Sequence, residues 1–156
     1  MFVDIYALAV TAVAVLVIGF AFIKGDEPER IGAGTYGLVA LAGALMPPDF
    51  GGGGRPMWGL MGLDIVQLAV FVGLAWHSRR AWPVWASAFQ ALVVTGHLLM
   101  VFDLQTSTNA LVAFAAMNNL ANYALLVALA VGTFWAWQER RAASMGSDNR
   151  TRPPRL

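Results

Sequence analysis

The chain has 156 residues, of which 58% are apolar and 12% are charged, whereas charged residues make up about a quarter of an ordinary soluble domain. This composition excludes a water-soluble globule and is typical of an integral membrane protein. Ten Lys and Arg stand against nine Asp and Glu, and the net charge of +1 provides no general attraction for nucleic acid. The absence of cysteine excludes a disulfide framework, thiolate metal sites and a cysteine nucleophile.

Five apolar segments approach the length of a membrane-spanning helix, which needs about 20 predominantly apolar residues. The expected spans, in chain order, are about 5–23, 31–46, 57–76, 81–102 and 109–137. The second is short and ends at Pro47 and Pro48, which cannot both continue a helix. The sequence therefore predicts an all-α polytopic membrane bundle with five transmembrane helices, or with four and a re-entrant second segment. We expect the spans to form a single helical domain over residues 1–143, followed by a disordered basic tail over residues 144–156.

The connections between these segments are charged or rich in turn-forming residues. Four consecutive glycines at 51–54 predict a flexible loop. This loop is not a phosphate-binding loop, because it lacks a Lys followed by Ser or Thr. The turn from His77 to Arg80 is so short that we expect the segments on its two sides to be antiparallel neighbours.

Basic residues predict the orientation, because cytoplasmic loops carry an excess of Lys and Arg. If all five segments span, nine of the ten basic residues lie on the side of the C-terminus and only Arg55 lies opposite. With a re-entrant second segment the split is seven against three. We therefore favour five spans, with the N-terminus outside and the C-terminus in the cytoplasm. Four arginines are expected to secure this topology and to lie near anionic lipid, namely Arg79, Arg80, Arg140 and Arg141.

The positions of the tryptophans and the ratio of Arg to Lys indicate where the protein is located. As in an interfacial belt, Trp58 lies near the expected outer boundary, and the inner boundary has Trp76, Trp82, Trp85, Trp135 and Trp137. No basic region precedes the first apolar segment, so we expect it to stay in the mature protein rather than to be cleaved as a signal peptide. The high ratio of Arg to Lys is typical of a GC-rich bacterial genome, and we expect a bacterial inner membrane.

Polar side chains inside the expected spans are the candidates for chemistry, because ionisable groups are costly in a bilayer and usually face the interior of a bundle. Asp64 and Gln67 share one face of the third segment, about 10 and 15 Å from its outer end. The fourth and fifth segments carry, at overlapping depths, Gln90, His97, Asn118, Asn119 and Asn122. The sequence thus predicts an intramembrane polar cluster in which His97 is the obvious partner of Asp64.

This polar cluster has three interpretations. Asn, Gln, Ser and His can hydrogen-bond across membrane helices for about 1 kcal/mol each, which would make the cluster a packing device. Alternatively, Asp64 and His97 line a small polar cavity that binds a ligand or passes a proton. In the third interpretation the polar faces contact a partner protein.

The sequence predicts no catalytic residues, no metal site and no cofactor. One haem cannot use both histidines, because His77 is expected at the inner boundary and His97 near the outer one. The helical His-Glu-x-x-His pattern of zinc hydrolases is missing from the sequence. Ser87 is not in a nucleophile elbow and is better explained as a small packing residue.

Small residues on the second segment predict close helix packing, because their side chains let two backbones approach. They recur at intervals of three or four residues at Ala33, Gly37, Ala40 and Ala44. The contact can lie within the bundle or between subunits.

We expect a small accessory or interaction subunit of a larger membrane assembly, without catalysis of its own. Its partners would be the lipid bilayer and either other membrane-protein subunits or further copies of itself, and no nucleic acid. The alternatives are a small proton-linked transporter or channel, or a membrane binder of a ligand or cofactor such as a lipid or quinone, both using Asp64 and His97. Small lesion-forming membrane proteins share the small size and the basic tail.

Overall fold

The computed structural model describes residues 2–46, 58–101 and 108–151, which form five α-helices and no strand. In chain order these are α1 (Phe2–Lys24), α2 (Glu27–Leu45), α3 (Trp58–Ser78), α4 (Trp82–Val101) and α5 (Thr108–Thr151). The expectation of an all-helical protein is confirmed for these residues. The predicted glycine-rich loop at 51–54 and the tail residues 152–156 lie outside the described residues.

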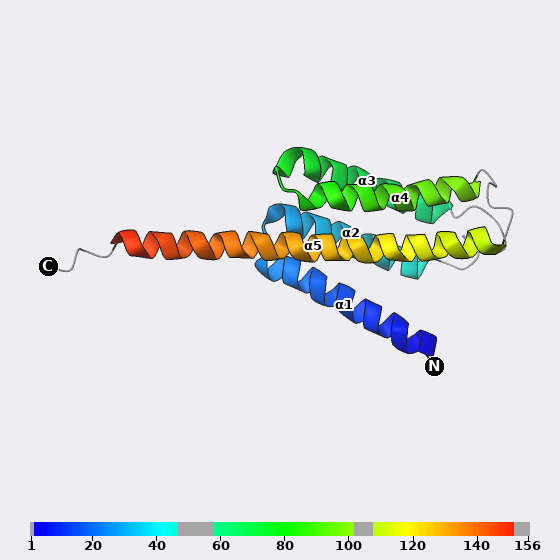
Figure 1. Cartoon of the computed structure of the whole chain (residues 1–156), viewed down its shortest axis with the longest axis horizontal. Helices are drawn as coiled ribbons and strands as arrows, with labels where there is room; N and C mark the ends of the chain where they lie inside the picture. Colours follow the sequence, from blue (N-terminus) through cyan, green and yellow to red (C-terminus); the bar gives the residue numbers. More distant parts are fainter. Residues whose placement is uncertain (1, 47–57, 102–107, 152–156) are drawn as a thin grey trace.

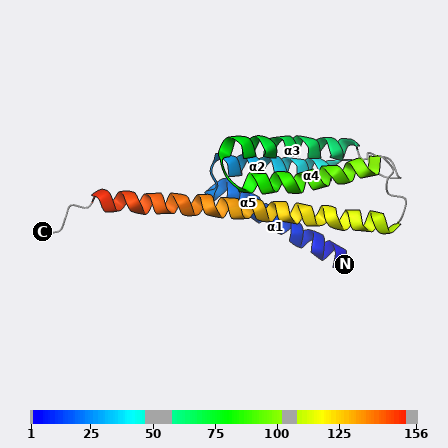
Figure 2. The same ribbon diagram turned by 45° about the horizontal axis from the view of Figure 1, so that its top comes forward.

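Helices α2 to α5 lie side by side, each antiparallel to the next, whereas α1 is only partly packed against them (Figure 1). Helix α1 contacts α2 and α5 near the α1–α2 turn and then diverges from α5 toward the N-terminus, as Figures 1 and 2 both show. The turns between α1 and α2 and between α3 and α4 lie at the same end of the bundle.

Helix α2 begins four residues before Ile31, where the apolar run was expected to start a helix. Asp26 precedes the helix, and its backbone N–H donates to Oε2 of Glu29 at 2.9 Å. Pro28 lies in the first turn, where a proline removes no helical hydrogen bond, and acidic side chains there are stabilised by the helix dipole. The helix therefore begins before the expected apolar span of 31–46, because hydropathy marks where a chain becomes apolar, while capping residues mark where a helix begins.

A tight turn joins α3 to α4. Arg79 directly follows α3 and has a φ of 52°, a left-handed conformation in which glycine is the usual residue after a helix. Pro83 then occupies the first turn of α4, where the N–H groups of Val84 and Trp85 both donate to the carbonyl of Ala81. The two helices are antiparallel neighbours, joined by a hydrogen bond between Gln67 and Gln90.

Helix α5 is 44 residues long and continues to Thr151, well beyond the bundle (Figure 1). The sequence predicts disorder from residue 144, and the structure differs over 144–151, which are helical. The physical reason is that extending an existing helix requires no new nucleation. Ala142, Ala143 and Met145 are also good helix formers although they bury no surface.

Among the residues that the structure describes, three helices are long and apolar enough to cross a membrane, over Trp58–Ser78, Trp82–Met100 and Ala115–Met145. Leu8–Lys24 in α1 is a shorter apolar helix. The first turn of α2 contains charged residues, so the apolar part of this helix covers only residues 31–45. Large apolar side chains cover the outside of these helices, including Leu8, Leu16, Leu38 and Leu120, as expected for surfaces that face lipid.

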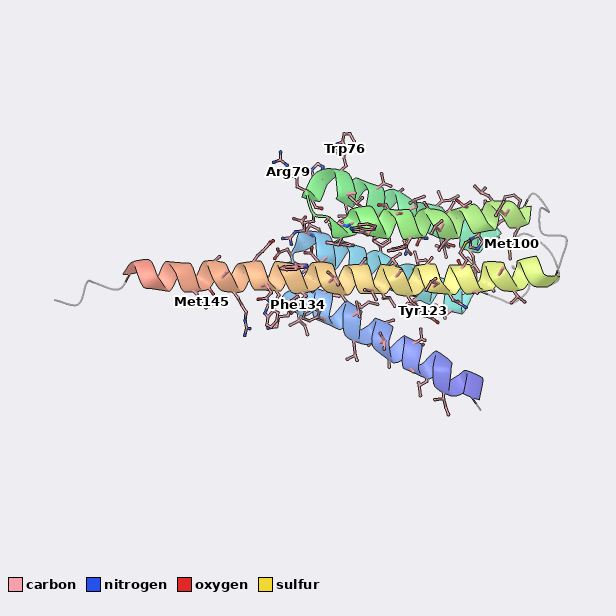
Figure 3. The ribbon with its side chains drawn as sticks, in the orientation of Figure 1. Trp76, Arg79, Met100, Tyr123, Phe134 and Met145 are labelled. Carbon is pink, nitrogen blue, oxygen red and sulfur yellow. The ribbon has the colours of Figure 1, made fainter. Side chains whose placement is uncertain are left out.

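The buried hydrophobic core lies toward the end of the bundle that holds the two turns. Its buried members are Ala21, Ala33, Phe71, Leu74, Trp82, Ala86, Leu125 and Leu129. The indole of Trp82 is 5% exposed and meets the ring of Phe71 edge to face. The expectation that Trp82 belongs to an interfacial belt is therefore wrong, whereas Trp76, next to the same turn, is 89% exposed (Figure 3).

Candidate functional site

Four polar side chains from α3 and α4 form the Asp64 cluster, defined by Asp64, Gln67, Gln90 and His97. Nε2 of Gln67 donates to Oε1 of Gln90 at 3.2 Å, and Nε2 of Gln90 donates to Oδ1 of Asp64 at 2.9 Å. Nδ1 of His97 lies 3.5 Å from Oδ2 of Asp64. The helical spacing that puts each pair on one face of its helix brings the two faces together across the hairpin.

The Asp64 cluster is largely enclosed. Gln90 and Gln67 are fully buried and His97 is 8% exposed, while the carboxylate of Asp64 remains partly accessible. Nδ1 of His97 is 3.1 Å from the carbonyl oxygen of Val93, so a proton on Nδ1 faces two acceptors, this carbonyl and the carboxylate of Asp64. The arrangement can bind the two helices to each other, and it can also hold a proton between an imidazole and a carboxylate.

Within the part of the chain that the structure describes, no hydrogen bond joins the three asparagines of α5 to this cluster. Nδ2 of Asn122 donates to the carbonyl of Asn118 within α5, and Asn119 is exposed. Oδ1 of Asn118 is buried without a hydrogen-bond partner among the described residues. Because α4 and α5 are antiparallel and Trp82 abuts Gly132, Asn118 lies at about the level of His97 along the bundle.

The predicted packing stripe on α2 separates into an inner and an outer half. Ala33 is fully buried, and a Cβ on Gly37 would lie 3.4 Å from Cδ1 of Ile18, so this half packs within the bundle against α1. Ala40 and Ala44 are exposed. The inner half therefore serves intramolecular packing, while the outer half lies on the apolar surface.

The four arginines expected at the membrane boundary have different surroundings. Arg80 and Arg140 both pair with Asp26, at 2.6 Å and 3.1 Å, and Arg141 lies over the indole of Trp137, 4.2 Å from the ring centroid. Arg79 is exposed, extends outward from the α3–α4 turn (Figure 3), and forms no ion pair with another described residue.

The sequence analysis missed a second polar site, the Glu29 junction, defined by Asp26, Glu29, Arg80, Trp82, Glu139 and Arg140. The carboxylate of Glu29 is fully buried and accepts a hydrogen bond from Nε1 of Trp82 at 2.7 Å. Nε of Arg80 lies 3.6 Å from the same oxygen. The sequence carries one usable signal, a charged residue three positions after the helix-capping Asp26, but the pattern of apolar segments marks 24–30 only as a charged connection between two spans.

Two glycines make room for the indole of Trp82 at the Glu29 junction. A Cβ on Gly32 of α2 or on Gly132 of α5 would collide with the ring. Trp82 therefore lies between two glycines on different helices while its N–H reaches the buried carboxylate of Glu29. The junction joins the α1–α2 turn, the α3–α4 turn, α2 and α5 around one side chain.

Two apolar grooves flank α5. One lies between α4 and α5, has a volume of about 830 Å³ and reaches Arg79 and Arg80 at the α3–α4 turn. The other lies between α1 and α5, where α1 diverges, and has a volume of about 530 Å³. It is lined by Ala9, Val10, Val13, Val17, Tyr123, Leu126, Val127 and Ala130.

Comparison of the chain with models of protein families, with curated proteins and with solved structures finds no match. Within residues 2–46, 58–101 and 108–151, no three His, Asp or Glu side chains are grouped so as to hold a metal ion.

Proposed function

We propose that this protein is an accessory or interaction subunit of a larger membrane assembly in a bacterial inner membrane, without catalysis of its own. The observation that carries the proposal is the divergence of α1 from α5, which leaves an apolar groove between two helices of one chain. Ala9, Val13 and Ala130 line it with small or β-branched side chains, which permit the close approach of another helix. A transmembrane helix of a partner subunit would complete the bundle at this groove.

The test is purification of the tagged protein from its native membrane in a gentle detergent, with a variant that fills the groove. We expect stoichiometric partner subunits with the wild-type protein and their loss with Val13→Trp, whose side chain would occupy the groove. Leu16→Trp is the matched control, because Leu16 is on the same helix and 71% exposed but does not line the groove. A wild-type protein that purifies alone, or partners that survive Val13→Trp, would contradict the proposal.

We also propose five membrane spans, with the N-terminus outside and the C-terminus in the cytoplasm. Support comes from the 2.6 Å ion pair between Asp26 and Arg80, because it brings the α1–α2 turn and the α3–α4 turn to one end of the bundle. If α2 were re-entrant while α1, α3 and α4 crossed, these two turns would lie on opposite sides of the membrane.

The absence of cysteine allows a direct test of this topology with single-cysteine variants and an impermeant maleimide. We expect Lys24→Cys and Arg79→Cys to react only after the cells are permeabilised. Gly52→Cys, in the loop outside the described residues, should react in intact cells. Opposite accessibility of positions 24 and 79 would favour the re-entrant alternative.

A second candidate function is a proton-linked transporter or channel, favoured by the 3.5 Å approach of the Asp64 carboxylate to the imidazole of His97. In this proposal the proton moves between these two groups, which lie in two of the helices apolar enough to span a membrane. Proteoliposomes with an internal pH dye provide the test. Proton flux that Asp64→Asn and His97→Ala both abolish would support it, and flux unchanged by either variant would contradict it.

A further inference from the structure

We infer that the groove between α4 and α5 is a binding site for an anionic phospholipid, with an acyl chain along the groove and the phosphate at Arg79. This inference depends on a membrane location but not on the proposed subunit role. Figures 1 and 2 both show α4 beside α5 along this stretch. The volume of about 830 Å³ lies within the usual range for sites that bind small molecules.

The floor of the groove is a row of small residues on α5. Ala124, Ala128 and Gly132 recur every four residues and all line it, so they form one continuous strip on a helix face. Such a row usually brings two helices into contact, but here Trp82 packs against Gly132, while Ala124 and Ala128 remain partly exposed. The strip leaves an apolar channel where a neighbouring helix would otherwise lie.

The length and the walls of the groove suit an acyl chain. From Leu120 to Trp135 the part of α5 that lines the groove spans 16 residues, or about 22 Å along the helix. Phe89 and Val127 are among the apolar side chains that line this stretch. Apart from Tyr123, the residues of α5 that line this stretch are apolar, and a hydrocarbon chain is the abundant apolar molecule inside a bilayer.

The charged end of the groove selects the headgroup. Trp85 and Trp135 line this end and are 62% and 61% exposed, as is typical of indoles at the level of lipid headgroups. Glu139 also lines the groove, but its carboxylate is 3.7 Å from Nη1 of Arg80, so its charge is partly offset.

Arg79 is the cation that an added anion would meet. Arg80 is already shared among Asp26, Glu29 and Glu139, whereas Arg79 forms no ion pair with another described residue. Its left-handed backbone, where glycine would be easier, indicates that the arginine is not there for the turn. A basic side chain beside a groove between membrane helices is the usual setting for an anionic lipid headgroup.

The experiment incubates the purified protein with equal amounts of phosphatidylglycerol and phosphatidylcholine and identifies retained lipid by native mass spectrometry. The wild-type protein should retain one phosphatidylglycerol in preference to phosphatidylcholine. Arg79→Gln should reduce this preference roughly fivefold. Arg141→Gln is the matched control, because it removes an equal charge from an arginine that lies outside the groove and should leave the preference unchanged.

A second pair of variants tests the acyl channel. Ala128→Leu should abolish lipid retention by filling the groove, whereas Ala88→Leu, on an exposed face of α4 outside the groove, should leave it intact. An unchanged thermal transition would show that both variants are folded. If Ala128→Leu unfolds the protein, the brominated acyl chain of phosphatidylglycerol should quench the fluorescence of the wild-type protein more than that of Arg79→Gln.

Several outcomes would overturn the inference. They are retention of no lipid, retention of a fatty acid or quinone instead of the phospholipid, equal retention of the two phospholipids, and lipid that survives Ala128→Leu in a folded protein. Each is distinct from failure of the subunit proposal, which concerns the groove on the other side of α5 and is read from partner subunits.

Discussion

The Glu29 junction and the Asp64 cluster both bury polar side chains in an apolar bundle, but they connect different numbers of elements. The junction joins two turns, α2 and α5 through ion pairs and the indole of Trp82. Among the described residues, the hydrogen bonds of the Asp64 cluster join α3 to α4, which a short turn already holds together. Trp82 of the junction is also a member of the buried hydrophobic core.

This difference separates polar groups that determine tertiary structure from those that reinforce a hairpin. Closing a short hairpin costs little chain entropy, so hydrogen bonds within it add only modest stability. The junction brings together residues more than 50 positions apart, and removing it would leave the α1–α2 hairpin with few other contacts to α4. The largest effects on stability are therefore expected at the junction.

Replacement of Trp82 should have the largest effect. Trp82→Ala removes a buried indole, leaves a cavity between Gly32 and Gly132 and takes the donor away from Glu29, and we expect a loss of about 4 kcal/mol. Trp85→Ala is the control, because Trp85 is 62% exposed. Equilibrium unfolding in mixed micelles measures both, and similar losses would show that the junction is not central to the fold.

The buried carboxylate of Glu29 should matter next. Glu29→Gln removes the charge that faces Arg80 and puts an amide group where the backbone N–H of Asp26 and the indole N–H both need acceptors. We expect a loss of about 3 kcal/mol, near the lower end for breaking a buried pair, because Arg80 keeps its contact with Asp26. Glu27→Gln, at an exposed position of the same turn, should change the unfolding free energy little, and an equal effect would argue against a specific role for Glu29.

Replacing glycine with alanine should change the stability of the protein in opposite directions at Gly132 and Gly73. Gly132→Ala forces a methyl group against Trp82 and should destabilise the protein by about 2 kcal/mol. Gly73→Ala has open space around its Cβ position and should stabilise helix α3 by somewhat less than about 1 kcal/mol. Thermal denaturation of the two variants in the same detergent compares them directly. A stabilising Gly132→Ala would mean that Trp82 is not held as described.

The smallest loss of stability is expected in the Asp64 cluster. Gln90→Met removes the hydrogen bonds to Gln67 and Asp64 and should cost about 1 kcal/mol, as for other hydrogen bonds between membrane helices. A double-mutant cycle with Gln67→Met should give a coupling energy below that size. A loss as large as that of Trp82→Ala would erase the contrast between the two sites.

Hydrophobic patterning was sufficient to predict the five helices, because an apolar run of this length can satisfy its backbone in a bilayer only as a helix. It also put Asp64 opposite His97, since spacing along two antiparallel helices predicts which faces can meet. The apolar segments differ from the observed helices at their ends, as at α2 and α5. Hydropathy does not distinguish the polar residues that cap or extend a helix from the residues of a loop.

The sequence by itself thus determined the helical class and the polar faces of α3 and α4, and three of the five spans that it predicts are helices long and apolar enough to cross a membrane. All of these follow from local periodicity and composition. Only the tertiary structure decided that Glu29 is buried, that Trp82 lies between two glycines and that α1 diverges from α5. Those features depend on contacts between residues far apart in the chain, and the pattern around any single residue carries no information about which distant helix will lie beside it.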